Sequence, residues 1–206
     1  MARKGIIQNT KGRALVTPAG SAMWVKVVEA NYKFNPKGEY EAQIICDPKD
    51  PKVKVYIDTL QKMTDDAVAE AREALKPPKD KSVVSREVTR PEYDKEGNET
   101  GNVIIKAKSF AVDYDGNPQK PEVYDVKGVL QENWNQLIGN GSTIKIQAWV
   151  SPYHMANGNV VGVSAKLNKI QILDLKVYGD DGFGDESGEE GFGDTAEVFE
   201  STGTDF

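Results

Sequence analysis

Alternating apolar and polar residues predict β-strands in four parts of the chain. The clearest is 40–46, where apolar residues at even positions alternate with Glu41 and Gln43. The same alternation is found in three later stretches, 103–112, 142–151 and 160–175. In the last of these, the apolar parity changes from odd to even between Leu167 and Ile170. This change predicts a β-bulge, which bends a strand as a small barrel requires.

A helical period follows the first strand. Between 51 and 75, apolar residues recur every three or four positions, which predicts one long amphipathic helix. Asp50 is a suitable N-cap and Pro51 is favoured in the first turn of a helix. Pro77 and Pro78 cannot continue the helix and are expected to end it.

The segment 76–102 is polar and interrupted by proline, so we expect an extended, basic excursion with one weak hairpin. Its basic residues are Lys76, Lys79, Lys81, Arg86, Arg90 and Lys95. About five strands, one long helix and glycine-containing turns predict a mainly β fold. We expect residues 1–178 to form one domain, a small closed or nearly closed barrel that the helix caps.

The end of the chain, 179–206, has a different composition. It contains ten acidic residues, whereas all 26 basic residues of the chain lie before it. Its seven glycines and the lack of any periodicity predict a disordered acidic tail. The tail also holds four of the six phenylalanines, Phe183, Phe192, Phe199 and Phe206. These rings and the terminal Asp205 are predicted to anchor the tail to another surface; the alternative is a tail that only solubilises the protein.

The sequence offers little for catalysis. A single cysteine, Cys46, excludes an internal disulfide, and a single histidine, His154, leaves few ligands for a metal. There is no phosphate-binding glycine loop, no nucleophile elbow and no zinc motif. No apolar run is long enough to cross a membrane, and the N-terminus lacks the apolar core of a signal peptide. We therefore expect an intracellular protein that is not an enzyme and that needs no metal or cofactor.

Basic and aromatic side chains alternate on the outer faces of two predicted strands. They are Lys106, Lys108 and Phe110 in 103–112, and Lys145 and Trp149 in 142–151. A turn after 151 is expected to place Tyr153 at a strand end. Ammonium groups neutralise phosphates and flat rings stack on unpaired bases, so this pattern favours binding of single-stranded nucleic acid. The alternative is that the lysines only solubilise the barrel and that Trp149 packs under a loop.

An acidic tail that is tethered to a basic barrel has a high effective concentration at any cationic groove of that barrel. We therefore expect the tail to compete with nucleic acid, and binding to depend strongly on salt. Two other functions remain open at this point. One is an RNA-binding module of the OB or cold-shock type. The other is an interaction protein whose tail mimics nucleic acid and whose barrel does not bind it.

A series of short motifs runs along essentially the whole chain. They are FNPKGEY at 34–40, DPKDP at 47–51, VYDVKG at 123–128, GS at 141–142, PY at 152–153, VSAKL at 163–167 and DF at 205–206. In order and spacing, the chain resembles the single-stranded DNA-binding proteins of T-seven-like short-tailed bacteriophages. The resemblance implies an OB-fold, a five-stranded antiparallel Greek-key barrel with one capping helix, and a homodimer.

The same resemblance implies a function. Such a protein coats and protects single-stranded DNA without sequence specificity in phage DNA replication, recombination and repair. The acidic tail is then expected to contact the replicative DNA polymerase and the helicase-primase. The implied location is the cytoplasm of the infected bacterium.

The resemblance also implies site residues. Tyr153 matches the base-stacking tyrosine of the family. Met155 stands where the family has a tryptophan, and Trp149 or His154 is expected to supply that second stacking contact. Lys37 stands where the family has an arginine in the turn N-P-R-G. The lysine keeps the positive charge but lacks the guanidinium group that can bind a phosphate through two hydrogen bonds. The remaining matches are of two kinds. The basic residues expected to contact DNA are Arg3, Lys4, Lys106 and Lys108, and the terminal aromatic residue that partner proteins are expected to recognise is Phe206.

Overall fold

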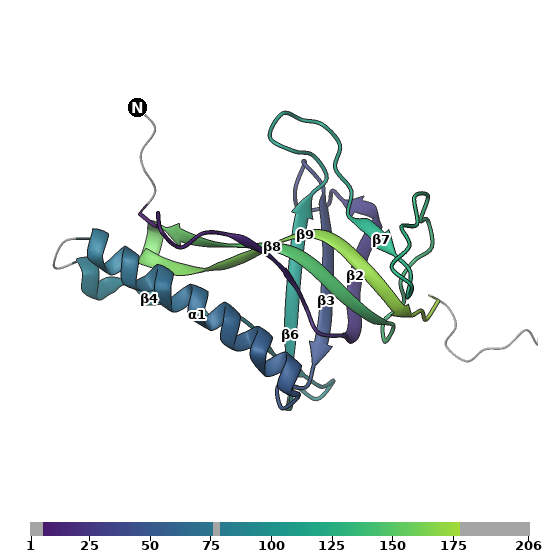
Figure 1. Ribbon diagram of the computed structural model, residues 1–206, viewed down its shortest axis with the longest axis horizontal. Coiled ribbons are helices and arrows are strands. Elements are labelled where there is room, and N and C mark those ends of the chain that lie inside the picture. Colours follow the sequence, from purple (N-terminus) through teal and green to yellow (C-terminus); the bar gives the residue numbers. More distant parts are fainter. Residues whose placement is uncertain (1–5, 76–78, 178–206) are drawn as a thin grey trace, which may run out of the picture.

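The structure, a computed structural model, describes residues 6–75 and 79–177. A strongly curved β-sheet forms its centre, and one long helix, α1 (Pro51–Ala74), lies against it (Figure 1). Two short 3-10 helices are η1 (Lys79–Ser82) and η2 (Asn157–Asn159). The strands within the described ranges are β1 (Arg13–Val16), β2 (Gly20–Asn31), β3 (Glu39–Cys46), β4 (Val84–Ser85), β5 (Arg90–Tyr93), β6 (Glu99–Phe110), β7 (Glu122–Tyr124), β8 (Thr143–Met155) and β9 (Val160–Asp174).

Five of these strands close into a ring. Neighbours pair in the order β2, β3, β6, β9, β8 and back to β2. The contact between β6 and β9 is parallel and consists of the pair Lys108 and Lys166, whereas the other ring contacts are antiparallel. The ring encloses fully buried side chains such as Ile44, Ile146 and Ile170. This OB-type barrel with one helix confirms the predicted fold class.

The predicted β-bulge is present in β9. Gln147 of β8 pairs with Lys169, and the next residue, Ala148, pairs with Leu167, so that Asn168 is the extra residue. The bulge explains the change in parity, because an inserted residue shifts every following side chain to the opposite face. It confirms an expectation based on the apolar pattern alone.

The predicted helix is also confirmed. The side chain of Asp50 accepts a hydrogen bond from the Lys52 backbone N–H at 2.7 Å, as an N-cap does. Residues in the N-terminal part of α1, such as Tyr56 and Leu60, pack into the barrel core. The C-terminal part instead forms a second apolar cluster, in which Ala67 packs with Val83 and Val161. Figure 1 shows the consequence: α1 extends beyond the barrel and supports the far ends of β8 and β9.

Two details of the strands differ from the predictions. The pattern did not reveal β2, because a bulge at Trp24 interrupts its alternation. The residues 151–155 are not a turn but continue β8 to Met155. Pro152 is tolerated there because β1 pairs with β8 only as far as Val150, so that one edge of the strand is free in the described part of the chain.

The basic excursion is more ordered than expected. A hairpin joins β5 to β6, and its turn is closed by a hydrogen bond of 2.9 Å from the Asp94 N–H to the Asn98 carbonyl. Consequently β6 begins at Glu99, four residues before the predicted strand. The expected acidic tail, 179–206, lies outside the described residues. Among the helices that are described, none has the length and apolarity that crossing a bilayer requires.

Candidate nucleic-acid interface

A row of outward-facing residues crosses all five strands of the ring. Successive partners in the sheet are Lys26 of β2, Glu41 of β3, Lys108 of β6, Lys166 of β9 and Trp149 of β8. We call these five residues the cross-strand row. Lys108 and Lys166 are direct partners in the sheet; the Lys108 ammonium group is paired with carboxylates of β3, and that of Lys166 donates a hydrogen bond of 3.2 Å to the Gln119 side chain. The row aligns three lysines and one tryptophan across the barrel, an arrangement that suits a polyanion with flat bases.

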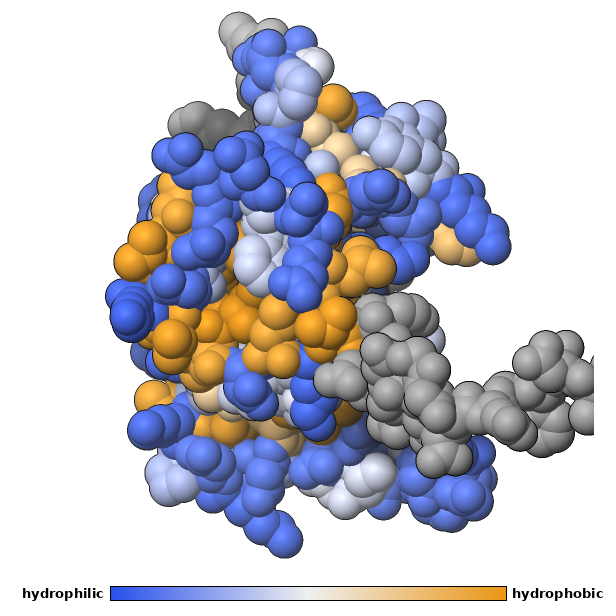
Figure 2. All heavy atoms as spheres, turned by 90° about the vertical axis from the view of Figure 1, so that its right-hand side faces the viewer, coloured by the Kyte–Doolittle hydropathy of each residue, from blue (hydrophilic) through white to orange (hydrophobic). Residues whose placement is uncertain are grey.

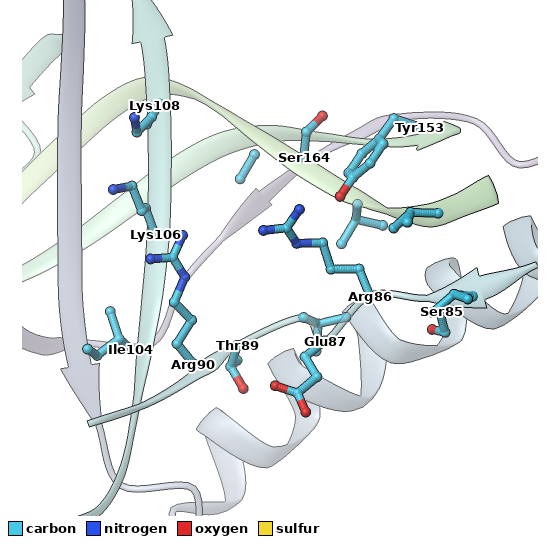
Figure 3. A pocket seen from close by; sticks show the side chains of 15 residues that line it. Ser85, Arg86, Glu87, Thr89, Arg90, Ile104, Lys106, Lys108, Tyr153 and Ser164 are labelled. Carbon is cyan, nitrogen blue, oxygen red and sulfur yellow. The ribbon is translucent and has the colours of Figure 1, made fainter. Parts of the chain in front are cut away.

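A groove of about 670 Å³ opens beside this row. One wall is the outer face of β6 with Lys106 and Lys108, and the other is the segment 84–90, which we call the strap. The strap contributes Arg86 and Arg90, whose guanidinium groups extend toward the sheet (Figure 3). Glu87 also lines the groove, but its carboxylate turns away from Tyr153 and the lysines (Figure 3). The groove is thus strongly basic.

Tyr153 forms part of the groove at the β8 side. Its ring lies directly over Gly162 of β9: a Cβ atom at that glycine would come within 2.9 Å of the tyrosine hydroxyl oxygen. The same Cβ position is 3.1 Å from the Cβ atom of Arg86. A side chain at this position would crowd both the tyrosine and the strap, so a glycine suits this close approach. Tyr153 is half-buried, and its hydroxyl points toward the Arg86 side chain (Figure 3).

Carboxylates of β3 hold the lysines of β6. Lys106 binds Glu41 at 2.7 Å, and Lys108 binds Glu39 at 3.0 Å and Glu41 at 3.4 Å. Hydrogen bonding to Glu39 raises the pKa of Lys108, and the same bond lowers the pKa of Glu39. Burial opposes ionisation of Glu41, but its hydrogen bonds with Lys106 and Gln43 outweigh this and leave its pKa below the usual value. Phosphates that approach β6 must therefore compete with two ionised carboxylates.

The loop before β3 extends the interface at the end of β6. It carries Lys37, whose ammonium nitrogen lies 6.0 Å from the ring centre of Phe110. A backbone hydrogen bond of 3.0 Å from Ala111 to Gly38 ties this loop to the end of β6. The structure thus brings Lys37 of the loop close to the end of β6, which carries Lys108 and Phe110, so that residues selected from two separate segments lie together.

Other selected residues lie elsewhere on the barrel. Trp149 belongs to the cross-strand row, and Gly12 packs so closely on it that a Cβ there would lie 2.6 Å from the indole nitrogen. Lys145 lines a separate hollow of about 290 Å³ with Gln147 and Lys169. His154 points to the other face of β8 from Tyr153, and its Nε2 is buried without a hydrogen-bond partner among the described residues.

Met155 is exposed at the end of β8. Seven selected residues lie outside the described ranges, namely Arg3, Lys4, Phe183, Phe192, Phe199, Asp205 and Phe206. Arg86 and Arg90 were counted in the basic excursion but not selected as site residues. The only available signal for them was their charge, because the sequence does not show that the strap folds back over β6. No cluster of histidine, cysteine or acidic residues in the described ranges could hold a metal.

An OB-type barrel with a basic groove and an aromatic side chain in its wall is typical of proteins that bind single-stranded nucleic acids. A family model for the single-stranded DNA-binding protein of bacteriophage T7 matches residues 20–176. The chain therefore belongs to this family of phage single-stranded DNA-binding proteins, which are not enzymes.

Known proteins show the same relationship. The single-stranded DNA-binding protein of Escherichia phage T7 is 27% identical over 77% of this chain and 72% of its own length. That of Enterobacteria phage T3 is 27% identical over 72% of this chain and 67% of its own length. The crystal structure of the T7 protein, gp2.5, superposes with a TM-score of 0.66 at 23% identity, covering 82% of this chain and 96% of that one.

A more distant structure shares the fold. The single-stranded DNA-binding protein of bacteriophage Enc34, in complex with single-stranded DNA, superposes with a TM-score of 0.52 at 13% identity. The match covers 84% of this chain and 96% of that protein. At this level of identity the likeness concerns the fold alone.

Proposed function

We propose that this protein coats single-stranded DNA during phage DNA replication, with little dependence on base sequence. The strand follows the cross-strand row, its phosphates lie in the basic groove, and Tyr153 stacks on a base. The observation that carries the proposal is the groove itself, which combines four basic side chains with an aromatic ring. Stacking and phosphate contacts ignore base identity, so low specificity is expected. Coated strands would be available for recombination and repair as well as for replication.

Tyr153→Ala tests this proposal. Stacking on one base contributes about 1–3 kcal/mol, so affinity for oligothymidine should fall at least about fivefold. Fluorescence anisotropy with labelled oligothymidine measures the change, and thermal unfolding verifies that the barrel is intact. Tyr93→Ala is the matched control, because Tyr93 is an exposed aromatic residue on the β5–β6 hairpin and lines neither the groove nor the cross-strand row. Equal affinities of the Tyr153 variant and the wild-type protein would remove this residue from the site.

The acidic tail is proposed to occupy the groove when DNA is absent. Its negative charge and the positive charge of the groove support this, and tethering gives it a high effective concentration there. Removing 180–206 should therefore tighten DNA binding at low salt, and the difference should shrink as salt rises. Anisotropy titrations of the two proteins between about 20 and 300 mM salt provide the measurement. Identical affinities at low salt would contradict the competition.

Once DNA displaces it, the tail is proposed to recruit the replicative DNA polymerase and the helicase-primase. Asp205 and Phe206 at its end, and the upstream rings Phe183, Phe192 and Phe199, are the residues we assign to these contacts. The setting of this function is the cytoplasm of the infected bacterium, where phage DNA replicates.

We also propose that two copies of the chain associate. Figure 2 shows hydrophobic side chains gathered in the middle of the face that carries β2 and β7 in Figure 1. The segment after β7 exposes Val126, Val129 and Leu137, among other apolar residues. Exposed apolar side chains gathered in this way often mark a protein–protein contact. A second copy of this chain is the partner that requires no additional component.

A further inference from the structure

Two large aromatic side chains are exposed at the β2 end of the cross-strand row. Phe34 is 82% exposed and Trp24 is 60% exposed. Both line a hollow of about 440 Å³ whose charged residues are Lys26, Lys108, Glu39 and Glu41. We call it the aromatic hollow. Rings of this size usually lose their contact with water on folding, so two in one hollow need an explanation.

The backbone of Trp24 is held in an unusual conformation. Its φ angle is +54°, in the left-handed region that bulky residues rarely adopt. The residue lies in the bulge of β2 between Met23 and Lys26, and its N–H donates a hydrogen bond of 3.0 Å to the Asn140 side-chain oxygen. A bulge re-aims a side chain, and strain of this kind persists where the surrounding structure enforces it, often at a functional site. Here it holds the indole away from the core.

The aromatic hollow is suited to a base rather than to a phosphate. Its two lysines are balanced by the two glutamates, so its lining carries no net charge. The ring of Phe34 is accompanied by the ammonium group of Lys33, which lies 5.4 Å from the ring centre. An aromatic platform with a flanking cation is the usual arrangement where a base stacks and its phosphate lies beside it.

The aromatic hollow and the groove have one lining residue in common. Lys108 lines both, and Lys26, at the hollow, is the β2 member of the cross-strand row. A strand of DNA that contacts Lys108 in the groove and continues across β3 therefore reaches Trp24 and Phe34. Resting on the function proposed above, we propose that Trp24 and Phe34 form a second base-stacking site, at the opposite end of the path from Tyr153.

There are two alternative occupants, and sedimentation of Trp24→Gly separates the first of them from DNA. A second copy of the chain would bury the rings in a dimer, and a phenylalanine of the tail would cover them in the free protein. The Lys108 that the aromatic hollow shares with the basic groove favours DNA over a second copy of the chain. A tail that is displaced from the groove by DNA would leave the aromatic hollow at the same time.

The test compares oligothymidines of increasing length with full-length variants. Trp24→Gly removes the ring and suits the left-handed backbone, and Phe34→Ala removes the other ring from an exposed position. Each should lower affinity about fivefold or more for an oligomer long enough to cross the barrel, while affinity for a very short oligomer that fills only the groove stays unchanged. Tyr153→Ala should weaken both oligomers, and Tyr93→Ala neither.

Tryptophan fluorescence gives an independent measurement. In Trp149→Phe the remaining indoles are Trp24 and the half-buried Trp134. Long oligothymidine should quench the tryptophan fluorescence of this variant, and adding Trp24→Gly to it should abolish the quenching. Sedimentation equilibrium of Trp24→Gly should give the wild-type mass.

The outcomes distinguish the two proposals. Weaker binding by Tyr153→Ala with unchanged binding by Trp24→Gly and Phe34→Ala would overturn the second site and leave the proposed function intact. A variant at Trp24 that changes the oligomeric state would assign the aromatic hollow to a dimer instead. If none of the variants, Tyr153→Ala included, changed the affinity for oligothymidine, the proposed function itself would be overturned.

Discussion

The two walls of the groove are both basic, but they hold their charges in different ways. On the sheet wall, Lys106 and Lys108 are paired with Glu39 and Glu41 in a regular antiparallel ladder. On the strap, neither Arg86 nor Arg90 forms an ion pair or a side-chain hydrogen bond with any described residue. The guanidinium groups are therefore ready to bind phosphate, whereas the lysines must first exchange one anion for another. Under the proposed function, we therefore expect the strap to supply affinity and the sheet wall to limit it.

The largest expected effect concerns the strap. Arg86→Ala with Arg90→Ala removes two phosphate contacts, so affinity for oligothymidine should fall at least about tenfold at moderate salt, and the dependence of log K on log salt should become less steep by about 1.4. Anisotropy titrations at several salt concentrations measure both quantities. Arg72→Ala, on the exposed side of α1, removes one positive charge away from the groove and should change neither quantity. An unchanged salt slope in the double variant would show that these arginines do not contact DNA.

A smaller effect of opposite sign is expected on the sheet wall. Glu41→Gln removes the carboxylate partner of Lys106 and one of the two partners of Lys108, so affinity should rise about threefold as the freed Lys106 ammonium group binds phosphate. The same titration detects it. Glu70→Gln is the matched control: it also removes one negative charge, but the Glu70 carboxylate binds backbone N–H groups and no lysine. A similar rise in both variants would mean that only net charge had changed.

The sequence was informative wherever local pattern decides the structure. The N-cap at Asp50, the period of α1 and the parity change at Asn168 all follow from neighbouring residues, and each was confirmed. The strand β2 was missed because its bulge at Trp24 breaks the alternation that identifies a strand. The end of β8 was missed because Pro152 resembles a turn signal, although a free strand edge also accepts proline.

The candidate site was harder to predict, since it depends on contacts between distant segments. Lys106, Lys108 and Tyr153 could be selected because their own strands or the family resemblance pointed to them. The place of Arg86 in the groove arises because the strap pairs with β9 at Val160 and Val161, a parallel contact between short segments that no local pattern announces. The pairing of the lysines with Glu39 and Glu41 likewise depends on the register of β3 against β6.

The smallest expected effect is on stability, and it comes from Glu70, the residue that serves as the control for Glu41. Glu70 accepts hydrogen bonds of 2.8 Å from the backbone N–H groups of Gln8 and Asn9, which anchor the N-terminal segment to α1. Although desolvation acts in the opposite direction, bonds from Thr10 and this backbone lower its pKa from 4.5 to about 2. A carboxyl group whose pKa is lower in the folded than in the unfolded protein stabilises the fold. The contribution is fully present above the pKa of the unfolded state, and it is lost as the pH falls toward the pKa of the folded state. The free-energy difference between wild type and Glu70→Gln, measured by urea unfolding, should therefore be below about 1 kcal/mol at pH 7, because the bonds are accessible to water. It should stay constant down to about pH 5 and shrink as pH approaches 3. A difference that instead grew on acidification would show that the carboxylate is not held in its ionised form.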